Sequence, residues 1–358
     1  MSLFYIDEAD ELNELVQRMS DRQYEQSPGL YDDLPERARR FMKRDFYYGV
    51  SYLFTALKLK KEAVFTSYIR WTYDYLSYLM LYVPRETMTA QIKDFYEAMR
   101  YCMADEVDED ERELVHAYFD HAADLIDRMG REEAHQGSGQ HLEYEAEVRE
   151  YLDLILQNRT RDALSFFKEL ETRGFDVDTI YVQIVQEVMH RIGELWFENK
   201  INVAQEHYAT ATTQMAMSQL YPSIFSVPSN SRTVIGCCMG GELHEMGMRV
   251  IMDLFTNHGY NSVFLGAGVP MESLLKKIEE QKPNLLALSV TMPQHLALCR
   301  DTIKMIKKER PDVLIAVGGR AFRDVDDEWS RWGADIYTED AKELIKWTDK
   351  KLGLTEIS

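Results

Sequence analysis

The residues best placed to bind a ligand lie in one short loop in the C-terminal third of the chain. This loop, residues 240–247, reads Gly-Gly-Glu-Leu-His-Glu-Met-Gly and joins an apolar run to a helical stretch. A lone loop histidine is usually a surface residue, but His244 has a carboxylate, Glu242, two residues before it. Gly247, three residues after it, leaves the backbone open to close approach. The spacing predicts a ligand site. A dinucleotide is a poor candidate, because the G-x-G-x-x-G fingerprint is absent.

Residues 232–358 supply the elements that would position this loop. Short apolar runs alternate there with amphipathic helical stretches, and most runs lack the polar alternation of half-exposed strands. The pattern predicts a doubly wound, flavodoxin-like (Rossmann-like) domain with a five-stranded parallel sheet. Ligands bind beyond the carboxyl ends of such strands, so we expect functional residues in the loops that follow them. The five runs are Thr233–Met239, Ser262–Leu265, Leu285–Val290, Val313–Val317 and Ala334–Tyr337.

Residues 142–226 have the pattern of a second, purely helical domain. A polar, glycine-containing linker at 128–141 precedes it, and the proline-containing segment Tyr221–Ser231 ends it. Four helices with short connections predict a four-helix bundle. The helical stretches are 143–157, 160–173, 177–195 and 202–220.

Residues 1–127 predict a third, aromatic-rich helical domain. Apolar residues recur at helical spacing, as in Phe54 and Leu57, and tyrosines are abundant. We favour a helical core with tyrosine hydroxyls at its rim. The alternative interpretation is a pocket for a flat conjugated ligand, for which aromatic walls are suited.

The spacing E-x-H-x-x-G resembles the signature of cobalamin-binding domains, in which Asp or Glu takes the first position. The resemblance implies that His244 is the lower axial ligand of cobalt, with the cofactor's own base displaced into the sheet. A neutral imidazole is a good cobalt ligand, and a carboxylate on its far nitrogen would fix its tautomer. We expect Glu242 to lie in this outer set of contacts, although its hydrogen-bond partner does not follow from the sequence.

Two further pairs of residues match the same family in order. Ser289 and Thr291 close the third apolar run, where the family places small hydroxyl residues along the cofactor's nucleotide tail. Gly318 and Gly319 close the fourth run, where the family needs room for that tail. The resemblance therefore assigns all four to cofactor binding.

The helical domain before the sheet resembles the cap of CarH-type adenosylcobalamin photoreceptors. Trp196 is followed, after nine residues, by Glu206 and His207. In that family these residues line the upper face of the cofactor, around the adenosyl group. One departure is Phe197, because the photoreceptors use a histidine there to capture cobalt after illumination. A second is that no basic DNA-binding domain precedes the cap.

The N-terminal domain is loosely similar to the helical module of stand-alone cobalamin sensors, among them photocobilins, which also bind a bilin. The segments that carry this likeness are Ala56–Leu57, Val64–Phe65 and Tyr68–Trp71. The resemblance implies a light sensor that holds adenosylcobalamin, with biliverdin as a possible second chromophore. Two alternatives stay open, a corrinoid shuttle for methyl transfer and a light-independent cobalamin-sensing regulator.

Composition limits the remaining classes of function. The 358 residues predict two or three domains at roughly 150 residues each. Lys and Arg number 41 against 61 Asp and Glu, and the net charge of −20 disfavours direct binding of nucleic acid. Four cysteines without a C-x-x-C pair predict reduced thiols, and no signal peptide or membrane span is evident. We expect a cytoplasmic, non-enzymatic protein that acts through a homo-oligomer or a protein partner.

Overall fold

The chain is divided into two compact units, residues 1–137 and 138–358. The computed structural model describes residues 9–354, apart from 28, 30, 32–35 and 133–142. Helix α5 continues to Arg131, three residues past the predicted start of the linker at 128, and the rest of that linker lies outside the described residues. The predicted bundle and the predicted sheet both belong to the second unit.

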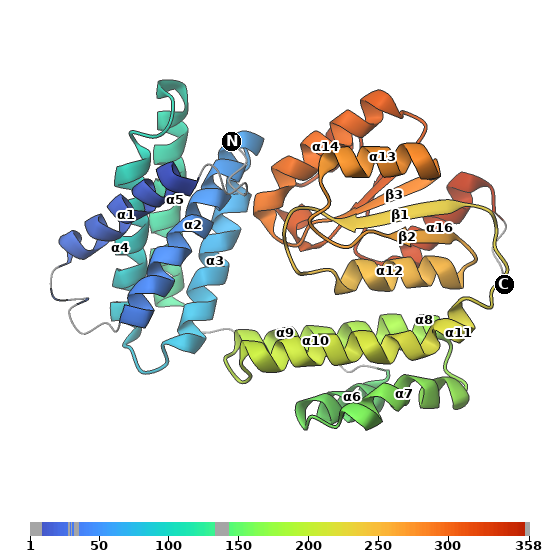
Figure 1. The fold of residues 1–358 in the computed structure, drawn as a ribbon. Coiled ribbons are helices and arrows are strands. Elements are labelled where there is room, and N and C mark those ends of the chain that lie inside the picture. Colours follow the sequence, from blue (N-terminus) through green and yellow to red (C-terminus); the bar gives the residue numbers. More distant parts are fainter. Residues whose placement is uncertain (1–8, 28, 30, 32–35, 133–142, 355–358) are drawn as a thin grey trace. The chain divides into compact units, whose positions relative to one another are not determined.

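The first unit is helical throughout its described residues (Figure 1). Helix α4 packs between α1 and α5, and α2 pairs with α3. The apolar positions at helical spacing face inward and form the core. The helices are α1 (Ala9–Gln26), α2 (Glu36–Leu59), α3 (Glu62–Leu79), α4 (Arg85–Met103) and α5 (Glu109–Arg131).

Aromatic side chains fill much of the core of this first unit. The rings of Phe46 and Phe95 stack with their centroids 4.1 Å apart. Tyr52 and Tyr68, both buried, stack at 4.4 Å. These contacts match the interpretation of an aromatic helical core.

The second unit begins with a helical bundle, α6–α11, called the cap bundle below. Asp176 caps the start of α8 by accepting a hydrogen bond from the amide of Thr179, at 2.6 Å. A π-helical turn, Ile180–Val185, joins α8 to α9, so the predicted helix 177–195 is interrupted there. The elements are α6 (Glu145–Leu156), α7 (Thr160–Thr172), α8 (Val177–Thr179), α9 (Gln186–Phe197), α10 (Val203–Met217), a 3₁₀ turn (Ser218–Leu220) and α11 (Tyr221–Ile224).

The rest of the second unit confirms the predicted α/β fold. Its five strands are all parallel, in the order β2-β1-β3-β4-β5, which is the flavodoxin-like order. In the register, Cys238 at the end of β1 lies beside Ser289 at the end of β3, which lies beside Gly318 on β4. The strands are β1 (Thr233–Cys238), β2 (Asn261–Phe264), β3 (Leu285–Ser289), β4 (Leu314–Gly318) and β5 (Ile336–Tyr337).

Helices cover both faces of this sheet. Helices α12 and α16 lie on one face, and α13 and α14 lie on the other (Figure 1). Strands and helices alternate along the chain, as the sequence pattern predicted. The helices are α12 (Met246–Asn257), α13 (Met271–Gln281), α14 (Leu296–Glu309), α15 (Glu328–Trp332) and α16 (Ala341–Leu352), with 3₁₀ turns at Pro293–His295 and Arg320–Asp324.

The cap bundle and the sheet share one hydrophobic core, in which α12 is the contact element. The Tyr181 hydroxyl, in the π-helical turn, donates to the carboxylate of Asp253 on α12 at 3.1 Å. Asp178 of α8 accepts from His258 Nε2 at 2.8 Å and from Asn257 at 3.0 Å. The carboxyl-terminal half of α12 is thereby fixed to the base of the cap bundle.

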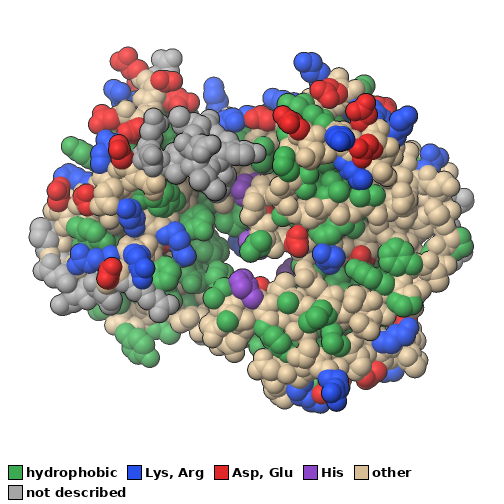
Figure 2. Space-filling model, viewed as in Figure 1, with side chains coloured by type: hydrophobic (Ala, Val, Ile, Leu, Met, Phe, Trp, Pro, Cys, Tyr) green, Lys and Arg blue, Asp and Glu red, His purple; other side chains and the backbone are tan. Residues whose placement is uncertain are grey.

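Side chains agree with the expectations drawn from composition. The four cysteines are unpaired and buried, and burial raises the pKa of Cys237 to about 12, so its thiol stays protonated. On the face drawn in Figure 2, acidic and basic side chains are interspersed. Across the described residues, no helix combines the length and the apolar character needed to span a bilayer.

The His258–Asp178 pair predicts a pH-dependent contribution to stability. The hydrogen bond from His258 to Asp178 raises the pKa of His258 above 6.5. Burial acts to raise the pKa of Asp178, but the bonds from His258 and Asn257 outweigh it and leave this pKa below 3.8. The pair therefore stabilises the fold from about pH 4 upward, and the effect is lost as the pH rises through the raised pKa of His258.

We expect His258→Gln to lower the free energy of unfolding by up to about 1 kcal/mol near pH 5 and by much less near pH 9. Urea denaturation of the full chain at both pH values measures the difference. Asp178→Asn should reproduce the effect, and the double variant should add little to either. An equal loss at pH 5 and pH 9 would contradict the assignment.

Candidate functional site

The loop between β1 and α12 and the loop between β3 and α14 meet where the strand order reverses. In flavodoxin-like sheets this is the ligand-binding edge. Glu242 joins the two loops, because its carboxylate accepts the amide of Thr291 at 2.9 Å and that of Met292 at 2.7 Å. Burial raises the pKa of Glu242, the two amides oppose that rise, and the result is about 7. Glu242 was expected near the far nitrogen of His244. Its hydrogen-bond partners in the structure are the two amides of the neighbouring loop.

The His244 side chain is accessible to solvent, although other parts of the protein lie close to it. Its side chain is exposed, but enough protein lies around it that burial lowers its pKa, while the charge of Glu206 acts in the opposite direction. The imidazole is neutral at neutral pH and free to offer a nitrogen lone pair. Beside it, no atom lies within 4 Å of where a side chain would begin at Gly241 or Gly247. This open space is where a large ligand could approach the loop.

The cap bundle contributes the second side of the site. Glu206, in the first turn of α10, accepts from Thr210 Oγ1 at 2.9 Å and contacts His207 Nδ1 at 2.6 Å. Its charge acts on His244, so this part of the cap bundle lies near the His244 loop. Trp196 is half-buried near the end of α9. The tight turn after α9, in which the amide of Asn199 bonds to the Trp196 carbonyl at 3.0 Å, returns the chain toward the site.

The ends of β3 and β4 hold the other four predicted residues. Ser289 and Thr291 are half-buried at the carboxyl end of β3, as the predicted run implies. Gly319 has φ +94°, and a side chain there would begin 2.4 Å from the carbonyl oxygen of Val290. Glycine is therefore required at 319 by a positive φ and by close backbone approach, and the room for the nucleotide tail implied by the family resemblance stays a prediction. At Gly318 the nearest atom is the Thr338 carbonyl, at 3.0 Å.

Sequence reasoning missed His295, in the 3₁₀ turn after β3. Its ring lies directly against Gly240, where a side chain would begin 2.3 Å from the ring Nδ1 atom. His295 is 4% exposed, and burial together with the charge of His244 lowers its pKa to about 4. The available signal was its position in the same post-strand loop as Thr291.

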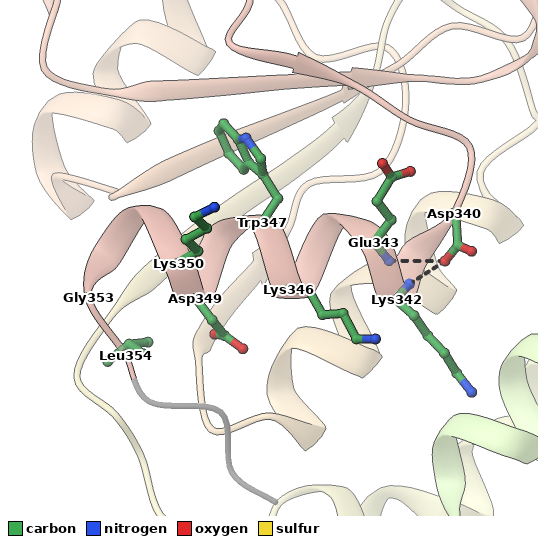
Figure 3. A pocket seen from close by; sticks show the side chains of 9 residues that line it. All are labelled: Asp340, Lys342, Glu343, Lys346, Trp347, Asp349, Lys350, Gly353 and Leu354. Carbon is green, nitrogen blue, oxygen red and sulfur yellow. Dashed lines mark hydrogen bonds between the residues drawn. The ribbon is translucent and has the colours of Figure 1, made fainter.

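An open groove elsewhere on the second unit does not belong to this site. Residues of α16 and the segment just after it line the groove, and the lysines 342, 346 and 350 lie along the helix (Figure 3). Asp340 caps the helix by accepting from the amides of Lys342 and Glu343. The groove contains none of the predicted site residues, and its lining is typical of a solvated helix face.

Comparison with known proteins finds two family matches in the second unit. Residues 232–346 match a B12 binding domain, and residues 147–221 match a second B12 binding domain model. Together they cover the sheet and most of the cap bundle. Neither match extends to the first unit.

Individual relatives are corrinoid proteins. Dimethylamine corrinoid protein 1 of Methanosarcina acetivorans is 25% identical over 163 residues, which is 44% of this chain and 75% of that protein. A corrinoid protein of Desulfitobacterium hafniense is 23% identical over 52% of this chain and 89% of its own length.

Among solved structures, the monomethylamine corrinoid protein of Methanosarcina barkeri aligns with a TM-score of 0.51 and 22% identity. The alignment covers 58% of this chain and 99% of that one, and it establishes a common fold. The two domain matches and the corrinoid relatives place the second unit, with its His244 loop, in the cobalamin-binding family.

Proposed function

We propose that this chain is a corrinoid carrier for methyl transfer, with His244 as the lower axial ligand of cobalt. A bound cobalamin supplies a metal that can carry a methyl group on its upper face. The observation that supports the proposal is the exposed His244 in the loop at the switch point of the sheet, near enough to Glu206 of the cap bundle to feel its charge. The relatives are named for dimethylamine and methanol systems, and we extend methyl transfer to this chain from those names.

The residues on the sheet fit such a group. His244 is neutral because of its lowered pKa, which is the state needed for metal binding. The open space at Gly241 and Gly247 admits a flat ring close to the loop backbone. Ser289 and Thr291 are half-buried at the carboxyl end of β3, where their hydroxyl groups would contact the nucleotide tail.

The residues on the cap bundle act on the other face. Trp196 offers a large apolar surface that would exclude water from the upper side. Glu206 and His207, which contact one another, offer polar groups beside it. A partner methyltransferase would have to displace this side to reach the cobalt, while α12 keeps the base of the cap bundle attached through Asp178 and Asp253.

A light sensor is the second candidate, supported by the spacing of Trp196, Glu206 and His207 and by a first unit outside both family matches. In this function the chain would hold adenosylcobalamin, with biliverdin as a second chromophore, and light would change its conformation or assembly. Phe197 stands where CarH-type receptors have the capturing histidine. A regulator that senses cobalamin without light would share the same residues.

Removal of the imidazole tests the part common to all three functions. We expect His244→Ala to weaken binding of hydroxocobalamin by tenfold or more, because a direct metal ligand is lost and outer contacts alone are worth about 10–100-fold. Titration followed by visible absorption measures the affinity and the change in nitrogen ligation. His121→Ala, at an exposed histidine of the first unit, is the matched control. Equal binding by His244→Ala and the wild type would refute the lower-ligand assignment.

Access to the upper face separates a carrier from a sensor. For a carrier we expect the cobalamin-loaded protein, reduced with titanium(III) citrate in darkness, to take up a methyl group from iodomethane within about tenfold of the rate of free cofactor, a barrier difference of about 1.4 kcal/mol. Absorption spectroscopy follows the reaction.

The same sample, loaded with adenosylcobalamin with and without biliverdin, is then illuminated with green or red light and examined by size-exclusion chromatography. A carrier keeps its size. Slow methylation that Trp196→Ala accelerates, together with a light-dependent change in size, would favour the sensor over the carrier.

A further inference from the structure

His295 and Gly240 make a direct contact between the two loops of the site. A side chain at Gly240 would begin 2.3 Å from Nδ1, 2.5 Å from Cε1 and 2.5 Å from Cγ of His295. The imidazole therefore occupies the space where another residue at 240 would have its side chain. Gly240 also has φ +76°, a conformation that glycine adopts without strain.

Further bonds hold this contact in place. The Gly240 carbonyl accepts the amide of Gly268 at 2.8 Å, and the Met239 amide donates to the Ser289 carbonyl at 2.9 Å. On the other loop, the amide of His295 donates to the Met292 carbonyl at 3.0 Å and closes the 3₁₀ turn. The backbone that carries the His295 ring is therefore held by hydrogen bonds within the 3₁₀ turn.

A second connection joins Glu242, two residues after Gly240, to Thr291 and Met292, which lie four and three residues before His295. Glu242 accepts the amides of Thr291 and Met292, so the loop before α12 is joined to the loop before α14 at Gly240 and again at Glu242. His244 follows directly after these two points. The position of the His244 ring depends on the backbone of residues 240–244, which the contacts at Gly240 and Glu242 fix to the loop after β3.

We propose that His295 is a positioning residue that, seated on Gly240, fixes the loop so that His244 is held ready for its ligand. The inference rests on the proposed binding of cobalamin by His244. His295 acts through packing, because its ring fills the space beside Gly240. The polar bonds between the two loops come from Glu242.

The test compares His295→Ala with His295→Phe in the full chain. Hydroxocobalamin titration should give an affinity about tenfold weaker for His295→Ala, a typical cost of removing an outer contact, and near-wild-type affinity for His295→Phe because the ring is restored. The EPR spectrum of the Co(II) form should show weaker or heterogeneous nitrogen coupling for His295→Ala only. His258→Gln, at the residue that follows α12 in the same unit, is the control for a nonspecific loss of stability.

A second pair of variants tests the packing of the His295 ring on Gly240 directly, while His295→Phe in the first comparison keeps the test valid if His295→Ala is poorly folded. Gly240→Ala should reduce affinity more in the wild-type background than in the His295→Ala background, because the steric conflict with the ring is absent there. Additive effects, or unchanged affinity and EPR coupling for His295→Ala, would overturn the positioning role. If His244→Ala also binds as the wild type does, the proposed function fails, whereas loss in His244→Ala alone rejects only the role of His295.

Discussion

The buried carboxylate of Glu242 is the interaction on which the site depends. Two neighbouring parallel strands end at the same edge of the sheet, but their loops leave in separate directions toward α12 and α14. Glu242 bridges them by accepting two successive amides from the other loop, at 2.9 and 2.7 Å. Such charge-assisted bonds are stronger than neutral ones, and breaking them would leave both the carboxylate and two amides without partners. The position of His244 is a consequence of this bridge.

The pKa of about 7 at Glu242 shows how closely the opposing effects are balanced. Burial favours the protonated acid, which would offer a donor where two amides need an acceptor. The ionised form satisfies both amides but carries the cost of a desolvated charge. The polar contact between the loops therefore carries the cost of burying a charged carboxylate. The packing of the neutral His295 ring on Gly240 joins the same loops without burying a charge.

Strand periodicity and the alternation of apolar runs were sufficient to predict the fold of the second unit, because strands buried on both faces have a distinctive composition. The same reasoning placed Glu242 and His244 in a loop at one edge of the sheet, and the family resemblance added Ser289, which ends β3, and Thr291 just after it. It could not identify the partners of Glu242, since backbone amides of another loop have no sequence signature. For the same reason it could not show that Gly319 is also required by its positive φ and by the Val290 carbonyl.

The contacts between the cap bundle and the sheet could not be predicted from the sequence pattern for a related reason. Tyr181, which bonds to Asp253, lies in the π-helical turn between α8 and α9, and nothing in the apolar spacing of 177–195 marks that turn. Burial raises the pKa of Asp253 to about 6, and the Tyr181 hydroxyl bond stabilises its ionised form.

Helix α12 thus begins directly after the loop of His244 and ends at Asn257, beside His258, which bonds to Asp178 of the cap bundle. A single rigid helix connects the proposed metal ligand to the base of the cap bundle. The Glu242 bridge holds the His244 loop on the side of β3, separately from the polar contacts between the far end of α12 and the cap bundle. Both candidate functions require this separation, since a carrier and a sensor must each change the upper face without losing the lower ligand.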